Sequence, residues 1–470
     1  MMARTLDAPP RSSPRRRSGY DPRVAVKGTY SRVDGDVTTV DIDARVRASV
    51  YGSFAAKGAE MVTMLLLATL VPRALGPEAY GRFAVPLTIV TLGSLAMSLG
   101  GPTLLSRYVP AAPPHEQLGL ARAIGARLAR GRAVQLGAVV AVVALASLLV
   151  PDQVPAADTA IVVVALVLGV AASVALQVPL GLGRTGPWAI RYPIQNTVLI
   201  IAVLLLHDST AVEGGLVAIL LATLVTATFA AVVLWPIVRA PGVPVPIPDG
   251  ALRFGAFHAS GAALLQIVHR GGVLLVAVLA GASAEAGYTA LATGLGLGVT
   301  YAVLQAFTVS LPHLAGPDTT SSGAEPVLHR LATVLLAVLL PLMLLVAVGL
   351  DQLVPAVFGK GYSDAVAAFG PVLAIIVLAP LGSLLVQAAA LRLRPEVALA
   401  NGVAAAAAFV AVGLVAVPTW GAEGGTLAAL AGIATGLVVS LRLLPGAASG
   451  WLSAGSLLGA AAVFAVAGLS

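Results

Sequence analysis

Long runs of Leu, Val, Ala and Gly, separated by short polar breaks, fill this sequence from about residue 50 to its last residues. Many runs reach about eighteen residues, the length that a helix needs to cross about 30 Å of hydrocarbon. Strands that span membranes alternate apolar and polar residues over about ten positions, and no such alternation is present. We therefore expect an all-α polytopic membrane protein.

Composition supports this class and excludes several others. The chain has 58% hydrophobic and 10% charged residues and a mean hydropathy of +0.95, whereas soluble domains carry about a quarter charged residues. It has 0 Cys, which excludes disulfides and thiolate metal sites. Lysine occurs only at Lys27, Lys57 and Lys360, none of them in a GK[ST] phosphate loop. We therefore expect no cofactor and no bound metal. We also expect no nucleic-acid partner, because the positive charges that give the net charge of +7 lie in the tail and in alternate loops, as membrane topology requires.

The runs predict two sets of six spanning segments and a weaker thirteenth. The first set is 50–72, 83–105, 132–150, 159–182, 187–206 and 214–238. The second set is 252–281, 287–313, 327–350, 365–391, 396–418 and 423–444, and the thirteenth segment is 452–469.

Polar and Pro-rich stretches divide the chain. Residues 1–45 are Pro- and Arg-rich and predict a disordered basic cytoplasmic tail. The stretch 239–251 contains repeated Pro and predicts a cytoplasmic linker. We expect an N-terminal six-helix lobe at 46–238, a C-terminal six-helix lobe at 252–444 and an additional C-terminal helix at 445–470.

The charges of the connections alternate as the span count requires. Arginines gather in every second connection, which predicts a cytoplasmic N-terminus in a plasma (inner) membrane. The residues counted on that side are Arg107, Arg122, Arg127, Arg130, Arg132, Arg184, Arg191, Arg239, Arg253, Arg330, Arg392, Arg394 and Arg442. The opposite side holds Arg73, Arg82 and Lys360.

Two predicted outer turns are faintly alike. Residues 75–85 read LGPEAYGRFAV and residues 281–291 read GASAEAGYTAL. Because both sets of six begin on the same side, any repeat would be parallel. Generic turn chemistry explains the two matches equally well.

A resemblance to a known family is carried by residues 70–110, LVPRALGPEAYGRFAVPLTIVTLGSLAMSLGGPTLLSRYVP. This stretch resembles the signature of bacterial polysaccharide flippases of the multidrug/oligosaccharidyl-lipid/polysaccharide exporter (MOP) superfamily, with an LGPxxYGxF-type turn between the first two spans. Partial matches to later outer turns follow at 284–292, 357–365 and 417–432. The resemblance covers about residues 50–445.

The resemblance implies a function as well as a fold. It implies two six-helix lobes around a central cavity that opens alternately to either side. It also implies transport of an undecaprenyl-pyrophosphate-linked oligosaccharide, or a similar anionic lipid-linked glycan, with a coupling ion left open. Many relatives carry an acidic residue late in the seventh helix, where this chain has His269, Arg270, Gly271 and Gly272. Ion coupling through such a carboxylate is therefore in doubt.

Polar residues within the seventh span are the first candidates for substrate binding. A cation at the centre of a spanning helix costs about 2.5–3.5 kcal/mol on insertion scales, so it usually faces a cavity or a partner. At 100° per residue, His258 and His269 share one direction, and Gln266 and Arg270 lie within a further arc of about 100°. We predict that Arg270 holds the anionic headgroup, the alternative being that it snorkels or pairs with a backbone carbonyl.

Three further candidates lie in other spans. Lys57 and Glu60 are three residues apart in the first span, where an ion pair between them would explain both without a substrate. Gln305 in the eighth span is an uncharged candidate, and a helix–helix hydrogen bond is its simpler explanation.

Other functions remain open, and one of them is transport of the peptidoglycan precursor or of a teichoic-acid type polymer. A multidrug antiporter would share the fold, although its cavity usually carries acidic residues suited to cationic drugs. A membrane polymerase or ligase for lipid-linked sugars would need acid, base or nucleophile groups in a sizeable outer loop, and the outer connections are about fifteen residues or shorter. We therefore expect a flippase for cell-surface polysaccharide synthesis and not an enzyme.

Overall fold

The computed structural model of the chain describes residues 39–97, 101–149, 156–206, 211–281, 283–314, 324–392 and 394–469. The chain divides into two compact units, 1–45 and 46–470. The predicted tail lies outside the described residues apart from 39–45, which begin the first helix.

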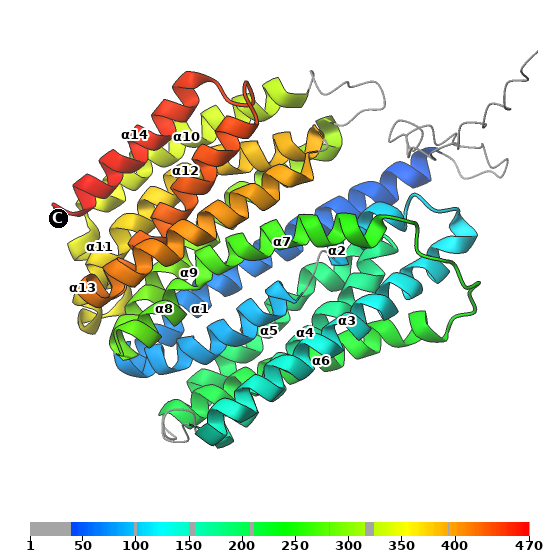
Figure 1. Cartoon of the computed structure of the whole chain (residues 1–470), viewed down its shortest axis with the longest axis horizontal. Helices are drawn as coiled ribbons and strands as arrows, with labels where there is room; N and C mark the ends of the chain where they lie inside the picture. The colour runs from blue at the N-terminus through cyan, green and yellow to red at the C-terminus, as the bar shows by residue number, and fades with distance from the viewer. Residues whose placement is uncertain are drawn as a thin grey trace, which may run out of the picture. The chain divides into compact units, whose positions relative to one another are not determined.

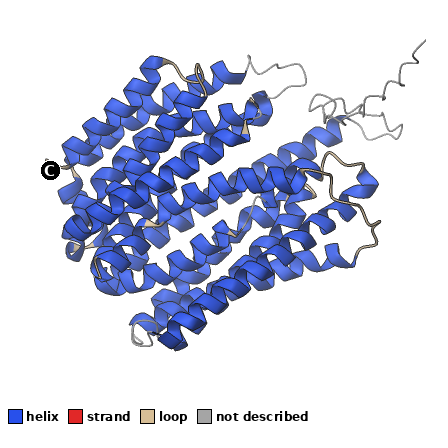
Figure 2. Cartoon of the chain, viewed as in Figure 1, coloured by secondary structure: helices blue, strands red, loops and turns tan. Residues whose placement is uncertain are grey.

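Every regular element in the described part of the chain is a helix (Figure 2). Helices are expected because a backbone in hydrocarbon must pair all of its N–H and C=O groups internally. The elements before the linker are α1 (Thr39–Ala96), α2 (Gly101–Tyr108), α3 (Pro114–Leu149), α4 (Ala156–Gly181), α5 (Thr185–Leu206) and α6 (Ala211–Arg239). The elements after it are α7 (Ala251–Arg270), α8 (Gly272–Leu279), α9 (Ser283–Leu314), α10 (Ala324–Val348), α11 (Leu350–Phe358), the 3₁₀ helix η2 (Lys360–Ala365), α12 (Val366–Leu391), α13 (Pro395–Leu443) and α14 (Gly450–Ala467).

Ten helices in the described residues are long and apolar enough to cross a membrane. Two of the ten, within α1 and α13, are interrupted by glycines in non-helical conformations. Gly76 has φ 73° and Gly421 has φ 51°, a region that favours glycine. The chain reverses at each point, so α1 and α13 each hold two of the predicted spans (Figure 1). The polytopic all-helical prediction is confirmed.

Several predicted boundaries were wrong. The span expected at 83–105 instead begins after Gly76, its helix ends at Ala96, and α2 follows from Gly101. Pro102 explains the new start, because proline has no N–H to donate and suits the first turn of a helix. The span expected at 252–281 agrees with α7 and α8 taken together, which run from Ala251 to Leu279 with Gly271 between them in the α-helical region.

Helix α3 differs most from the prediction. It begins at Pro114, eighteen residues before the expected start at 132. Its first turns are amphipathic, and Leu120, Ile124 and Leu128 are buried in a cluster with Leu105 of α2. The arginines that alternate with these residues led us to place the segment in a connection.

The described helices pack in two groups that meet the linker from either side. Helices α2–α6 contact one another, and α7–α14 contact one another, while α2 also contacts α7 (Figure 1). These contacts agree with a two-lobed arrangement; the lobe boundaries at 46–238 and 252–444 stay a prediction.

The linker between α6 and α7 is non-helical, as its prolines predict, but it is docked rather than free. Arg122 of α3 donates hydrogen bonds to the carbonyls of Ile237 and Ala240 at the end of α6. Val245 and Ile247 of the linker pack against the α2–α3 cluster. Arg122, expected only as a topology residue, thus pairs carbonyls that the helix end leaves open.

We call the end of the bundle that carries this linker the linker end, and the opposite end, with the Gly76 and Gly421 turns, the turn end.

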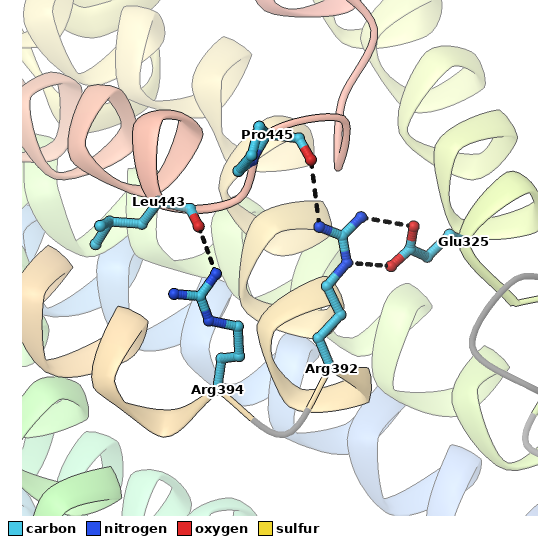
Figure 3. A network of polar contacts seen from close by, with 5 residues as sticks. All are labelled: Glu325, Arg392, Arg394, Leu443 and Pro445. Carbon is cyan, nitrogen blue, oxygen red and sulfur yellow. Dashed lines mark hydrogen bonds and ion pairs between the residues drawn. The ribbon is translucent and has the colours of Figure 1, made fainter.

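At the linker end, arginines connect helices of the second group by ion pairs and hydrogen bonds (Figure 3). Arg392, after α12, makes a two-pronged ion pair with Glu325 of α10 at 2.6 and 2.8 Å. Its hydrogen bonds to Glu325 raise the pKa of the Arg392 guanidinium. Arg394 donates to the carbonyl of Leu443 at 2.7 Å, and Arg392 contacts the carbonyl of Pro445 before α14.

Aromatic rings accompany arginines at the same end. The Arg191 guanidinium lies 3.2 Å from the ring centre of Trp188, and that of Arg239 lies 3.9 Å from Trp235. Trp and Arg are typical of the boundary between hydrocarbon and headgroups. The pattern supports a membrane boundary here, and the cytoplasmic location of this end stays a prediction.

Candidate functional site

The candidate site lies on α7, which is held against α13 by glycines. A Cβ at Gly261 would overlap the carbonyl oxygen of Ala398, and one at Gly402 would lie 2.6 Å from the carbonyl oxygen of Gly261. Near the other end of this contact, a Cβ at Gly272 would lie 3.2 Å from the carbonyl oxygen of Gly425. Small residues allow such close backbone packing in membranes. Helix α7 therefore has a fixed rotation, with its glycine face on α13.

Arg270 and Gln266 lie on the face of α7 that points away from α13. At 100° per residue they are about 40° apart and roughly opposite Gly261. Arg270 is the last residue of α7, directly before the irregularity at Gly271. Its Nε is buried and has no hydrogen-bond partner within the described residues. A buried donor without an acceptor costs free energy, and a ligand that supplies one would recover it.

Gln266 contacts a residue that the sequence did not suggest. The Tyr301 hydroxyl of α9 donates to Oε1 of Gln266 at 2.8 Å. His269 is half-buried, one residue from Arg270. The structure thus brings Gln266, His269 and Arg270 together on the last turn of α7 and adds Tyr301. Only the helical spacing of the first three could be predicted, because Tyr301 is distant in sequence.

No contact among the described residues places the remaining candidates beside the last turn of α7. Glu60 is half-buried in α1, where Thr63 donates to its backbone carbonyl and Asn196 of α5 donates to Thr63. The side chains of Lys57, His258 and Gln305 lie outside the described residues. Their roles, and the Lys57–Glu60 ion pair, stay predictions.

Arg132 is a polar residue that the sequence prediction misplaced. It was assigned to a cytoplasmic connection, yet it lies inside α3 and its residue surface is only 1% exposed. Nε donates to the carbonyl of Met97 at 2.5 Å, and an Nη nitrogen donates to Oε1 of Gln177 at 3.2 Å. A Cβ at Gly101 would overlap that Gln177 oxygen. Arg132 therefore binds the end of the first helical segment after Gly76, beside the start of α2.

The Arg132 cluster continues by one further hydrogen bond. Nε2 of Gln177 donates to the Ser173 hydroxyl at 3.2 Å, within α4. A signal for this cluster existed in the sequence, since Gly101–Pro102 marks a helix start and Gln177 is an isolated polar residue in an apolar run. Pairing these with Arg132 required the fold.

Solved structures identify the fold. The chain superimposes on Lipid II flippase MurJ in an inward closed conformation with a TM-score of 0.59 and 10% identity, covering 90% of this chain and 98% of that one. It superimposes on an inward-facing multidrug resistance MATE family transporter of the MOP superfamily with a TM-score of 0.54 and 15% identity, covering 87% and 96%. This chain shares the fold of these two proteins. No family model and no curated protein matches the sequence.

Helix α7 is the first helix after the linker, it contacts α2 of the first group, and Gly271 links it to α8. The described residues hold no group of three or more His, Cys, Asp or Glu that could bind a metal ion.

Proposed function

We propose that this chain is a secondary transporter that moves a lipid-linked oligosaccharide across the plasma membrane for cell-surface polysaccharide synthesis. In this proposal Arg270 binds the pyrophosphate of the lipid carrier, and Gln266, His269 and Tyr301 bind its oxygens and the first sugar. Lys57, Glu60, His258 and Gln305 remain candidates on the same path.

The observation that carries the proposal is the state of Arg270. A cation inside a spanning helix is costly and is normally paired. No ion pair of Arg270 occurs among the described residues, and its Nε is buried without an acceptor. A guanidinium presents planar paired donors that match phosphate oxygens. An anionic ligand at the last turn of α7 would supply the missing acceptors.

The fold alone does not choose the substrate. One structural neighbour is named as a lipid II flippase and another as a multidrug resistance transporter, and one fold serves several functions. The multidrug alternative favours acidic groups for cationic drugs, and Arg270 is unsuited to them. An undecaprenyl-pyrophosphate-linked glycan meets the requirement for an anion with a long apolar tail.

The test is flipping in proteoliposomes that contain an undecaprenyl-pyrophosphate-linked saccharide. Arg270→Gln should reduce the flipping rate by about tenfold or more, since charge-assisted bonds to a phosphate are worth about 1.5–3 kcal/mol. Arg270→Lys should be intermediate, because lysine keeps the charge but loses the planar fork. Protein yield and thermal stability should stay near the parental values.

Arg73→Gln is the matched control, because Arg73 is exposed at the turn end. It should flip at the parental rate. Export of a cationic dye is measured in the same vesicles. If Arg270→Gln flips the lipid normally, the site assignment is wrong; if only the dye is transported, the substrate assignment is wrong.

A further inference from the structure

The two similar turns noted in the sequence lie against each other at the turn end. Gly81 belongs to the first turn, and Ser283 and Gly287 belong to the second. A Cβ at Gly81 would overlap the carbonyl oxygen of Ser283 and would lie 2.9 Å from the backbone nitrogen of Gly287. A Cβ at Gly287 would lie 2.5 Å from the carbonyl oxygen of Pro77. Helix α1, before the linker, and α9, after it, therefore meet here backbone to backbone, at what we call the glycine seam (Pro77, Gly81, Ser283 and Gly287).

These two glycines are required by proximity and not by their backbone conformation. Gly81 and Gly287 lie within helices and are not among the glycines with positive φ. Gly76, in the same turn, does have positive φ and is needed for the reversal itself. An alanine at Gly81 or Gly287 would suit its own helix better than glycine by about 1 kcal/mol. The nearest atoms to an added methyl group at either position belong to the opposite backbone.

A tyrosine forms a hydrogen bond across the glycine seam, which we call the Tyr362 latch. The Tyr362 hydroxyl of η2 donates to the carbonyl of Pro72 at 2.9 Å, across the same interface. That carbonyl lies four residues before Gly76, near the end of the first helical segment of α1. Tyr362 also packs edge-on against Tyr288 with ring centres 6.1 Å apart. A Cβ at Gly361 would be 3.5 Å from the Pro77 ring.

We propose that the glycine seam and the Tyr362 latch form the gate at the turn end, shut in this structure, and that the missing side chains at Gly81 and Gly287 permit the shut state. The contacts join the two groups of helices by packing and one hydrogen bond, which can separate without stranding a charge. Opening would transfer the Pro72 carbonyl and the Tyr362 hydroxyl to water. The inference holds for any substrate and does not rest on the role of Arg270.

The geometry predicts that an added methyl group destabilises the shut state and leaves the open state unchanged. A methyl group at Gly81 needs the facing backbone to retreat to an ordinary separation of about 3.5–4 Å, which the shut seam does not allow. The open state is unaffected, because the two turns are then apart. A penalty on the shut state alone shifts the balance toward the open state, and about 1.4 kcal/mol changes their ratio tenfold.

The experiment measures the distance across the seam in the full-length protein. Glu78 and Ser363 are exposed on opposite sides, and the chain has 0 Cys, so Glu78→Cys with Ser363→Cys gives a unique pair of spin labels. Pulsed electron resonance on the parental background should show a short main distance. Gly81→Ala should move the main population to longer distances, with at least a tenfold fall in the ratio of short to long. Gly287→Ala should act in the same direction, and Tyr362→Phe should do so more weakly.

Gly294→Ala is the matched control, because Gly294 lies in α9 like Gly287 and an added Cβ would have nothing within 4 Å. It should leave the distances unchanged. If Gly81→Ala and Gly287→Ala both keep the parental distances while the proteins remain folded, the seam is not the gate. If one variant fails to fold, the other decides, since each glycine predicts the same shift alone.

Discussion

Two arginines inside the helical bundle, Arg132 of α3 and Arg270 of α7, differ in burial and in the hydrogen bonds that they make to the protein. Arg132 is fully enclosed, and it donates to the Met97 carbonyl and to Gln177. Arg270 is half-buried, and its Nε lacks an acceptor within the described residues. Arg132 donates to the end of α1 beside the start of α2, whereas the Nε of Arg270 remains able to bond a further acceptor.

In our proposal, this difference separates a structural cation, Arg132, from a binding cation, Arg270. A buried donor is tolerated when its hydrogen bonds are made within the protein, and it costs free energy when they are not. A chain that keeps an unmatched cation in a membrane helix accepts this cost, which selection for binding would explain. The comparison predicts opposite consequences for the same substitution at the two positions.

The largest expected effect is at Arg132. Arg132→Met would leave the Met97 carbonyl and the Gln177 amide without their donor, at about 1–3 kcal/mol for each buried acceptor. We expect the variant to have a markedly lower melting temperature than the parental protein. The measurement is the fraction of protein that remains monodisperse in detergent after heating. Arg130→Met is the control, because Arg130 is exposed on the same helix. If Arg132→Met is as stable as the parental protein, Arg132 does not have the structural role that we assign to it.

Arg270→Met should have a smaller effect on stability, with the opposite sign. Removal of an unpaired cation saves part of the about 2.5–3.5 kcal/mol that insertion scales assign to it. The same heating assay should therefore give an unchanged or higher melting temperature. A clear loss of stability would show that Arg270 is held by the protein itself, and the comparison would fail.

The smallest expected effect is at Arg392, which is charged and paired but partly exposed. The side chains of Arg392 and Glu325 are 26% and 22% exposed, so water and salt screen the pair. Arg392→Gln should lower the unfolding free energy by up to about 1 kcal/mol. Glu325→Gln should match it, and the double variant should add little. In about 1 M salt the difference from the parental protein should shrink; a salt-independent difference would contradict a screened ion pair.

The sequence was informative wherever one segment determines the outcome. The apolar runs predicted the helices, and the LGPEAYG stretch predicted a tight reversal that the structure places at Gly76. The prolines of 239–251 predicted a non-helical linker. The polar face of α7 followed from helical spacing alone.

The sequence was uninformative wherever a feature depends on contact between two segments that are distant in sequence. Arg132 followed other arginines, and that pattern favours a cytoplasmic connection until the Met97 carbonyl and Gln177 are placed beside it. The same reason hid Tyr301 beside Gln266. The similar turns were visible, but only the fold shows that they touch, because a close approach of two backbones leaves no trace beyond a pair of glycines.

The docked linker sets a limit on how far the two groups of helices can part. Val245 and Ile247 are packed against the α2–α3 cluster, and α7 begins at Ala251. Only residues 248–250 remain between the anchored part and the next helix, ending at Gly250 with φ 79°. Three extended residues reach about 10 Å. Ala251 is itself buried in that cluster, so both ends of this short segment are anchored: while the anchors hold, the start of α7 stays beside α2 and α3, whatever happens at the other end of the bundle.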